Sequence, residues 1–232
     1  MSVVYLQHVN TKLALHPLRE ARGSDRALLF LHGLGECTPA TVPAYLDAWS
    51  GPIWGLDFTG HGASAVPAGG GYTAEILMAD VDHALAHIGE ATVFGRGLGA
   101  YIALLIAGGR PRLVAGAILD DGPGLAGGGP SPTSPVAVRP VEAAAEQGAT
   151  PMTPDGYALV EMGRDIRPAD YATLYVRQSL QFSGLDGPIS VVGVVRPPWL
   201  TAVAEETGVV TSTLAEALAR YAVIERAEPP RA

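Results

Sequence analysis

The segment around Gly97 limits the possible folds of this chain more than any other. An apolar run from Thr92 to Phe94 leads into Gly95-Arg96-Gly97-Leu98-Gly99, and residues 98–107 behind it are apolar nearly all round. This order predicts a buried strand, a very tight turn and a buried helix. The central residue of such a turn usually carries about 1–3 kcal/mol of backbone strain. Glycine largely avoids that strain because it has no Cβ.

Two earlier strand-like runs also end in glycine-rich turns. Residues 27–31 lead into His32-Gly33-Leu34-Gly35, and residues 53–56 lead into Asp57-Phe58-Thr59-Gly60-His61-Gly62-Ala63-Ser64. In this order and at these distances, the three segments resemble the α/β-hydrolase family: its His-Gly loop, its D-x-x-G-x-G-x-S turn and its G-x-S-x-G elbow. The resemblance covers residues 3–121. It implies an α/β fold with a mostly parallel central sheet, helices on both faces and a reduced cap.

The remaining pattern alternates strands and helices, as such a sheet requires. We expect a single domain over residues 1–232, with a cap or lid insertion at 125–187, where breaker residues cluster and the family inserts its cap. The predicted strands are 3–7, 13–15, 27–31, 53–56, 92–94, 114–119, 189–195 and 209–211. The predicted helices are 73–88, 98–107, 141–147, 155–164, 199–206 and 213–224. The residues between the first two strands match a tight two-residue turn poorly.

Charge and composition narrow the function. The net charge of −8 argues against nucleic acid or an anionic membrane as a partner, because both would repel the chain. The N-terminal residues show no secretion signal, and no apolar run reaches the roughly 18 residues that a membrane span needs. We therefore expect a cytoplasmic protein. The single cysteine, Cys37, excludes an internal disulfide and a thiolate zinc site, and we expect no metal or cofactor.

The catalytic residues of a serine hydrolase are missing at two distant positions. Gly97 stands where the elbow of the family carries its serine. All six histidines precede the elbow, so the stretch 208–214, where the family delivers its general base, offers only Thr211, Ser212 and Thr213 as polar side chains. The stretch 194–198 holds no carboxylate for the usual acid position, although Asp120 or Asp121 could replace it.

Several residues have both a functional and a structural interpretation. His32 could take part in a site at the oxyanion loop or could hold that loop in place. His61 could be a functional residue or could stabilise its tight turn. Cys37 could be a nucleophile or an inert thiol. Arg96 could bind a carboxylate or phosphate, or could pair with Asp120 or Asp121. His83, His87 and Asp80 could present metal ligands or a solvated helix face. The expected ligand-binding residues are His32, Gly33, Arg96, Gly97 and Leu98.

Three functional hypotheses follow. The first is a non-catalytic pseudohydrolase that binds a small anionic or apolar ligand, or a protein partner through its cap; its elbow is similar to that of the N-myc downregulated family, which also lacks the serine. The second is an enzyme with a non-standard site built from His32, Asp121 and Arg96, with Cys37 as a further candidate. The third is an interaction module whose cap fills the cavity. If Gly97 occupies the elbow, Gly97→Ser should cost on the order of 1 kcal/mol and create no activity.

Overall fold

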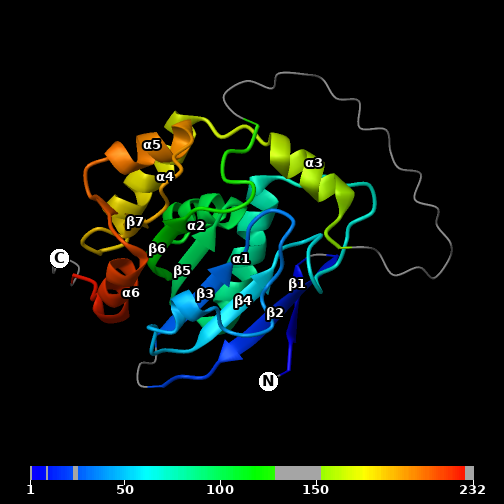
Figure 1. Ribbon diagram of the computed structural model, residues 1–232, viewed down its shortest axis with the longest axis horizontal. Coiled ribbons are helices and arrows are strands. Elements are labelled where there is room, and N and C mark those ends of the chain that lie inside the picture. Colours follow the sequence, from blue (N-terminus) through cyan, green and yellow to red (C-terminus); the bar gives the residue numbers. More distant parts are fainter. Residues whose placement is uncertain (1, 9, 23–25, 129–152, 228–232) are drawn as a thin grey trace.

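A computed structural model describes residues 2–8, 10–22, 26–128 and 153–227. Eight strands form one sheet in the order β1-β2-β4-β3-β5-β6-β7-β8 (Figure 1). The β1–β2 and β2–β4 pairs are antiparallel and every other pair is parallel. The strands are β1 Val4–His8, β2 Thr11–Arg19, β3 Ala27–Leu31, β4 Ile53–Asp57, β5 Ala91–Arg96, β6 Val114–Asp120, β7 Ile189–Val191 and β8 Val209–Thr211.

Several predicted strand boundaries were wrong, most clearly those of β2, which runs Thr11–Arg19 where we expected 13–15, and of β7. Pairing of β1 with β2 continues to His8 and Thr11, so the connection is shorter than the residues between them suggested. Strand β7 ends at Val191, although the apolar run continues to Val195. The backbone N–H groups of Val194 and Val195 donate to the carboxylate of Asp121 and not to a neighbouring strand.

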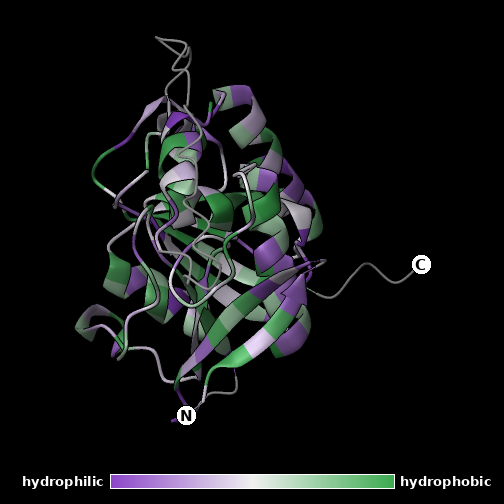
Figure 2. Cartoon of the chain, turned by 90° about the vertical axis from the view of Figure 1, so that its right-hand side faces the viewer, coloured by the Kyte–Doolittle hydropathy of each residue, from purple (hydrophilic) through white to green (hydrophobic). Residues whose placement is uncertain are grey.

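Helices cover both faces of the sheet, as predicted. One core packs Leu29, Leu31 and Val93 of the sheet against α1, α2, α4 and α5. The alternate residues of the same strands, such as Leu28 and Phe94, pack against α6 and the short 3-10 helix η1. Figure 2 shows hydrophobic segments inside this arrangement and hydrophilic positions on the outer helix surfaces. The helices are η1 Ala44–Leu46, α1 Ala74–Ile88, α2 Leu98–Gly109, α3 Gly156–Arg164, α4 Ala169–Phe182, α5 Pro198–Glu205 and α6 Leu214–Val223.

Local sequence signals fix several helix ends. The Thr73 hydroxyl accepts from the Ile76 N–H at the start of α1, and Thr213 forms a reciprocal capping box with Glu216 at the start of α6. The predicted cap segment contains α3 and also α4, a helix that we did not predict. Ala172 and Val176 of α4 are buried in the core that contains α2. The predicted helix at 141–147 lies outside the described residues. No helix in the described ranges is both long enough and apolar enough to cross a membrane.

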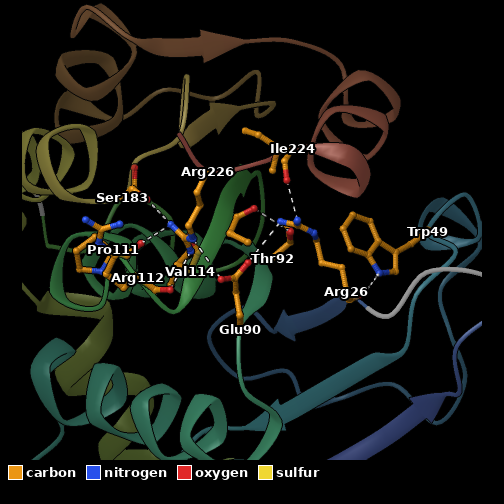
Figure 3. Close-up of polar contacts among 11 residues, drawn as sticks. Arg26, Trp49, Glu90, Thr92, Pro111, Arg112, Val114, Ser183, Ile224 and Arg226 are labelled. Carbon is orange, nitrogen blue, oxygen red and sulfur yellow. Dashed lines mark hydrogen bonds and ion pairs between the residues drawn. The ribbon is translucent and has the colours of Figure 1, made fainter. Parts of the chain in front are cut away.

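Arg226 fastens the C-terminal segment to the end of the sheet opposite the elbow. Its guanidinium donates to the carbonyl oxygens of Pro111 (3.0 Å), Arg112 (2.9 Å) and Val114 (3.2 Å), as well as to that of Ser183 (Figure 3). Its Nε also donates to Glu90, at 3.2 Å. These acceptors belong to separate segments of the chain, so this one side chain holds several loop ends together.

Candidate functional site

Gly97 lies at the turn between β5 and α2, as the sequence predicts. Its backbone angles are φ 59° and ψ −121°, a region that side-chain-bearing residues rarely adopt. The flanking glycines are required by close approach: an added Cβ would lie 2.1 Å from the Gly99 carbonyl oxygen at Gly95, and 2.5 Å from the Leu31 carbonyl oxygen at Gly99. The turn therefore has the tight geometry of a nucleophile elbow but carries no nucleophile.

A backbone carbonyl group accepts hydrogen bonds from two backbone N–H groups at this elbow. The Pro123 carbonyl oxygen accepts from the Leu98 N–H at 2.9 Å and from the Leu34 N–H at 3.0 Å. Leu98 follows the central residue of the elbow, and Leu34 lies in the loop after β3. In α/β-hydrolases, N–H groups from these two places form the oxyanion hole. Here both donors are already engaged by the protein itself.

The same loop fills the space above Gly97. A Cβ atom at Gly97 would lie 2.1 Å from the Pro123 oxygen, 2.6 Å from the carbonyl carbon of Gly122 and 2.8 Å from the Pro123 nitrogen. All three neighbours are backbone atoms, which cannot move aside as a flexible side chain can. We call residues 121–125 the plug loop. In this conformation no nucleophilic side chain fits at position 97.

A buried arginine holds the plug loop. Arg167 donates through Nη1 to the carbonyl oxygens of Gly124 (2.5 Å) and Leu125 (2.7 Å). Its guanidinium also lies 4.6 Å from the centre of the Tyr101 ring, and desolvation by burial lowers its pKa. The indole N–H of Trp199 donates to the same Leu125 oxygen, at 2.8 Å. Arg167 belongs to no sequence motif and lies 42 residues from Leu125, so no local pattern predicted its role.

His32 holds two loops together through both ring nitrogens. The Phe58 N–H donates to Nε2 at 3.1 Å; the proton must therefore lie on Nδ1, which donates to the Gly33 carbonyl at 2.8 Å. Its side chain is fully buried. Burial, with a smaller contribution from His61, lowers its pKa to about 4. A neutral ring with both nitrogens engaged by the backbone has no free group for a ligand or a proton transfer.

His61 has the same arrangement one loop further along. The Gly35 N–H donates to its Nε2, and its Nδ1 donates to the Thr59 carbonyl, both at 3.2 Å. Burial lowers its pKa as well. The centres of the two imidazole rings lie 5.0 Å apart. Together His32 and His61 connect the loop after β3 to the loop after β4.

The D-x-x-G-x-G-x-S turn is held by its own aspartate. The Asp57 carboxylate accepts from the N–H groups of Thr38 (2.7 Å) and Ala63 (2.8 Å), and lies 2.9 Å from His16 Nε2. A Cβ at Gly62 would lie 2.1 Å from this carboxylate, which explains the glycine. The motif therefore shapes the turn and presents no free carboxylate.

Arg96 pairs with a residue that the sequence analysis did not consider. Its Nη1 lies 2.8 Å from Glu36 Oε1, while the other oxygen of Glu36 accepts from the Gly33 N–H at 2.9 Å. Both side chains are about one-third exposed, at 33% and 30%. The predicted partners Asp120 and Asp121 make no hydrogen bond to Arg96. Asp120 accepts from the Asp121 N–H, and burial raises its pKa.

The other candidates do not converge on the elbow. Cys37 is exposed, and partial desolvation together with the carboxylates of Asp57 and Glu36 raises its pKa, which disfavours the thiolate. Asp80 is buried and bonded to His8 and Thr59, and His83 Nδ1 donates to the Ala79 carbonyl. Within the described ranges, no group of three His, Cys, Asp or Glu side chains is placed to hold a metal ion.

A pocket of about 320 Å³ lies beside the plug loop. It is lined by Asp121, Gly122, Gly124, Leu125, Ala126, Gly127, Gly163 and Val195. None of the predicted ligand-binding residues lines it. The plug loop forms one wall, and Gly163 of α3 and Val195 lie on other walls.

The comparisons with known proteins place the chain by its fold. No protein-family model matches it, and none of the curated proteins matches it. A probable hydrolytic enzyme from Pseudomonas aeruginosa PAO1 matches with 26% identity over 51% of this chain and 40% of that one, with a TM-score of 0.44. The mouse alpha/beta hydrolase domain-containing protein 10 matches with 22% identity over 55% and 51%, with a TM-score of 0.45.

The chain thus spans about half or less of the length of these hydrolase structures. A hypothetical protein from Pseudomonas aeruginosa PAO1 matches over 95% of this chain and 97% of its own length, with 17% identity and a TM-score of 0.61. That likeness shows a shared fold alone. The strand order and the three loops described above give the chain an α/β-hydrolase fold.

Proposed function

We propose that this α/β-hydrolase-fold protein is non-catalytic and acts by binding. The observation that carries the proposal is the Pro123 carbonyl oxygen on the N–H groups of Leu34 and Leu98. Those two donors would have to receive the oxygen of a substrate in any acyl-transfer reaction at this elbow. The missing serine at position 97 and the absence of any histidine after it support the same conclusion independently.

The alternative, an enzyme with a non-standard site, has weaker support from the geometry. His32 has no free ring nitrogen, and Arg96 is paired with Glu36. The Asp121 carboxylate lies in a different place, against the N–H groups of Val194 and Val195. Nothing brings these three side chains around one reacting atom, which general acid–base chemistry requires.

Because the plug loop fills the elbow, we place the proposed binding surface away from Gly97. An anionic ligand at Arg96 would have to compete with the Glu36 carboxylate, so we favour the neighbouring pocket or a protein partner. The local likeness to the N-myc downregulated family, the cytoplasmic location, and the exclusion of nucleic acid and membranes all stay predictions.

Fluorophosphonate labelling tests the proposal. We expect neither the wild-type protein nor Gly97→Ser to be labelled or to hydrolyse p-nitrophenyl esters above the buffer rate, because no histidine can take the proton from a serine at position 97. An active serine hydrolase in the same tube checks the probe. Stoichiometric labelling of wild type, mapped by mass spectrometry to a residue near the elbow, would contradict the proposal; labelling of Gly97→Ser alone would reveal an overlooked base.

A further inference from the structure

Among the described residues that line the pocket beside the plug loop, one is ionisable, Asp121. The other lining residues are glycines and the apolar side chains of Leu125, Ala126 and Val195. The pocket volume of about 320 Å³ lies near the lower end of the range of small-molecule sites, about 300–1,000 Å³. A ligand here would therefore meet a single fixed charge in mostly apolar surroundings.

The Asp121 carboxylate is held in place but not neutralised. The Val194 N–H donates to Oδ2 at 2.8 Å, and the Val195 N–H donates to Oδ1 at 3.0 Å and to Oδ2 at 3.1 Å. Two backbone donors fix the orientation and leave lone pairs free, because a carboxylate offers about four acceptor positions. No arginine, lysine or histidine among the described residues forms an ion pair with it. The chain's net charge of −8 adds to the attraction for a cation.

Exposed apolar side chains lie at and next to Val195, one of the lining residues. Val195 is 64% exposed, and Val194 beside it is 86% exposed. Their backbone N–H groups are bonded to Asp121 and do not continue β7. The residues that orient the carboxylate therefore also supply apolar surface next to it.

We propose that this pocket binds a small organic ammonium ion, with its charged nitrogen on the Asp121 carboxylate and its apolar substituent against Val195, Leu125 and Ala126. The proposal rests on the proposed binding function and names its ligand class. It differs from the sequence-based expectation of an anionic ligand at Arg96, because the free charge at the pocket is negative.

Three probes of equal chain length test the charge: n-hexylammonium, hexanoate and 1-hexanol, measured by isothermal titration and by thermal shift. We expect hexylammonium to bind and raise Tm, hexanol to bind more weakly, and hexanoate to show no binding. Asp121→Asn keeps the size and one acceptor oxygen, and should weaken hexylammonium binding by about tenfold or more, since a charge-assisted hydrogen bond is lost. Its effect on hexanol should be small.

A second pair of variants tests whether hexylammonium binds in this pocket. Gly163→Leu puts a side chain into the pocket: its Cβ would meet only Leu34 Cδ2, at 3.8 Å, so it should fold. Gly156→Leu is the matched control, because Gly156 lies in the same helix α3, does not line the pocket and has no atom within 4 Å of its Cβ position. We expect Gly163→Leu to abolish hexylammonium binding and Gly156→Leu to retain it.

Equal binding of hexanoate, or unchanged hexylammonium binding in Gly163→Leu, would overturn the proposal. Absence of hexylammonium binding to the wild type would do the same. None of these results bears on the proposed lack of catalysis, because fluorophosphonate labelling reports only on the elbow.

Discussion

Replacing Gly97 by serine tests how firmly the plug loop fills the elbow. The sequence alone predicts a loss on the order of 1 kcal/mol from backbone strain, within a range of about 1–3 kcal/mol for such positions. The structure adds a collision, since the new Cβ would lie 2.1 Å from the Pro123 oxygen. If the loop moves away, the N–H groups of Leu34 and Leu98 lose their acceptor. Two hydrogen bonds at about 0.5–1.5 kcal/mol each add about 1–3 kcal/mol to a strain of about 1–3 kcal/mol.

The variant Gly89→Ser separates the cost of backbone strain from the cost of displacing the plug loop. Gly89 also has a positive φ, of 82°, but no atom lies within 4 Å of its Cβ position. We expect urea denaturation to show a loss of about 1–3 kcal/mol for Gly89→Ser and about 2–6 kcal/mol for Gly97→Ser. At about 2–4 °C per kcal/mol for a chain of this size, thermal melting resolves the difference.

The comparison can fail in one clear way. If Gly97→Ser costs no more than Gly89→Ser, the plug loop yields without loss, and its contact with the two N–H donors contributes nothing to stability. The elbow would then not be closed by its own backbone.

Two further predictions concern the loops around the elbow. Burial lowers the pKa of His32 to about 4, so the unfolded state binds a proton at this residue first as the pH falls, and the free energy of unfolding should decrease between pH 6.5 and 4 by roughly 3 kcal/mol from this group. In His32→Gln, urea denaturation should show a flatter dependence on pH in that range, and an unchanged dependence would refute the assignment. Arg167→Met should raise the amide hydrogen exchange rates selectively at Leu34 and Leu98, because the carbonyl groups of Gly124 and Leu125 lose their donor and the plug loop loosens. The control Arg226→Met, at the opposite end of the sheet, should destabilise the protein without this selectivity, and equal exchange patterns in the two variants would contradict the role of Arg167.

The sequence by itself determined the framework of this protein. Strand–turn–helix order around Gly97, and the glycine-rich turns after residues 31 and 57, depend on local rules: apolar runs bury, and glycines stand where backbones approach closely. The helix beginning after Thr73 was predicted well because its cap and apolar face are both local. That residue 97 is glycine and that no histidine follows it can be read from the sequence, so the prediction that a standard triad is missing did not require coordinates.

Only the tertiary structure decided what occupies the site. The Pro123 carbonyl reaches Leu34 and Leu98 because three strand ends meet at one edge of the sheet, and no local pattern in residues 121–125 announces that contact. The same holds for the ion pair of Arg96. Its partner is Glu36, 60 residues away in the chain, and not one of the aspartates at the end of the neighbouring strand β6. Helix α4 was missed although Ala172 and Val176 have helical spacing. Its burial depends on α2, and burial is a property of the packed chain that spacing indicates only weakly.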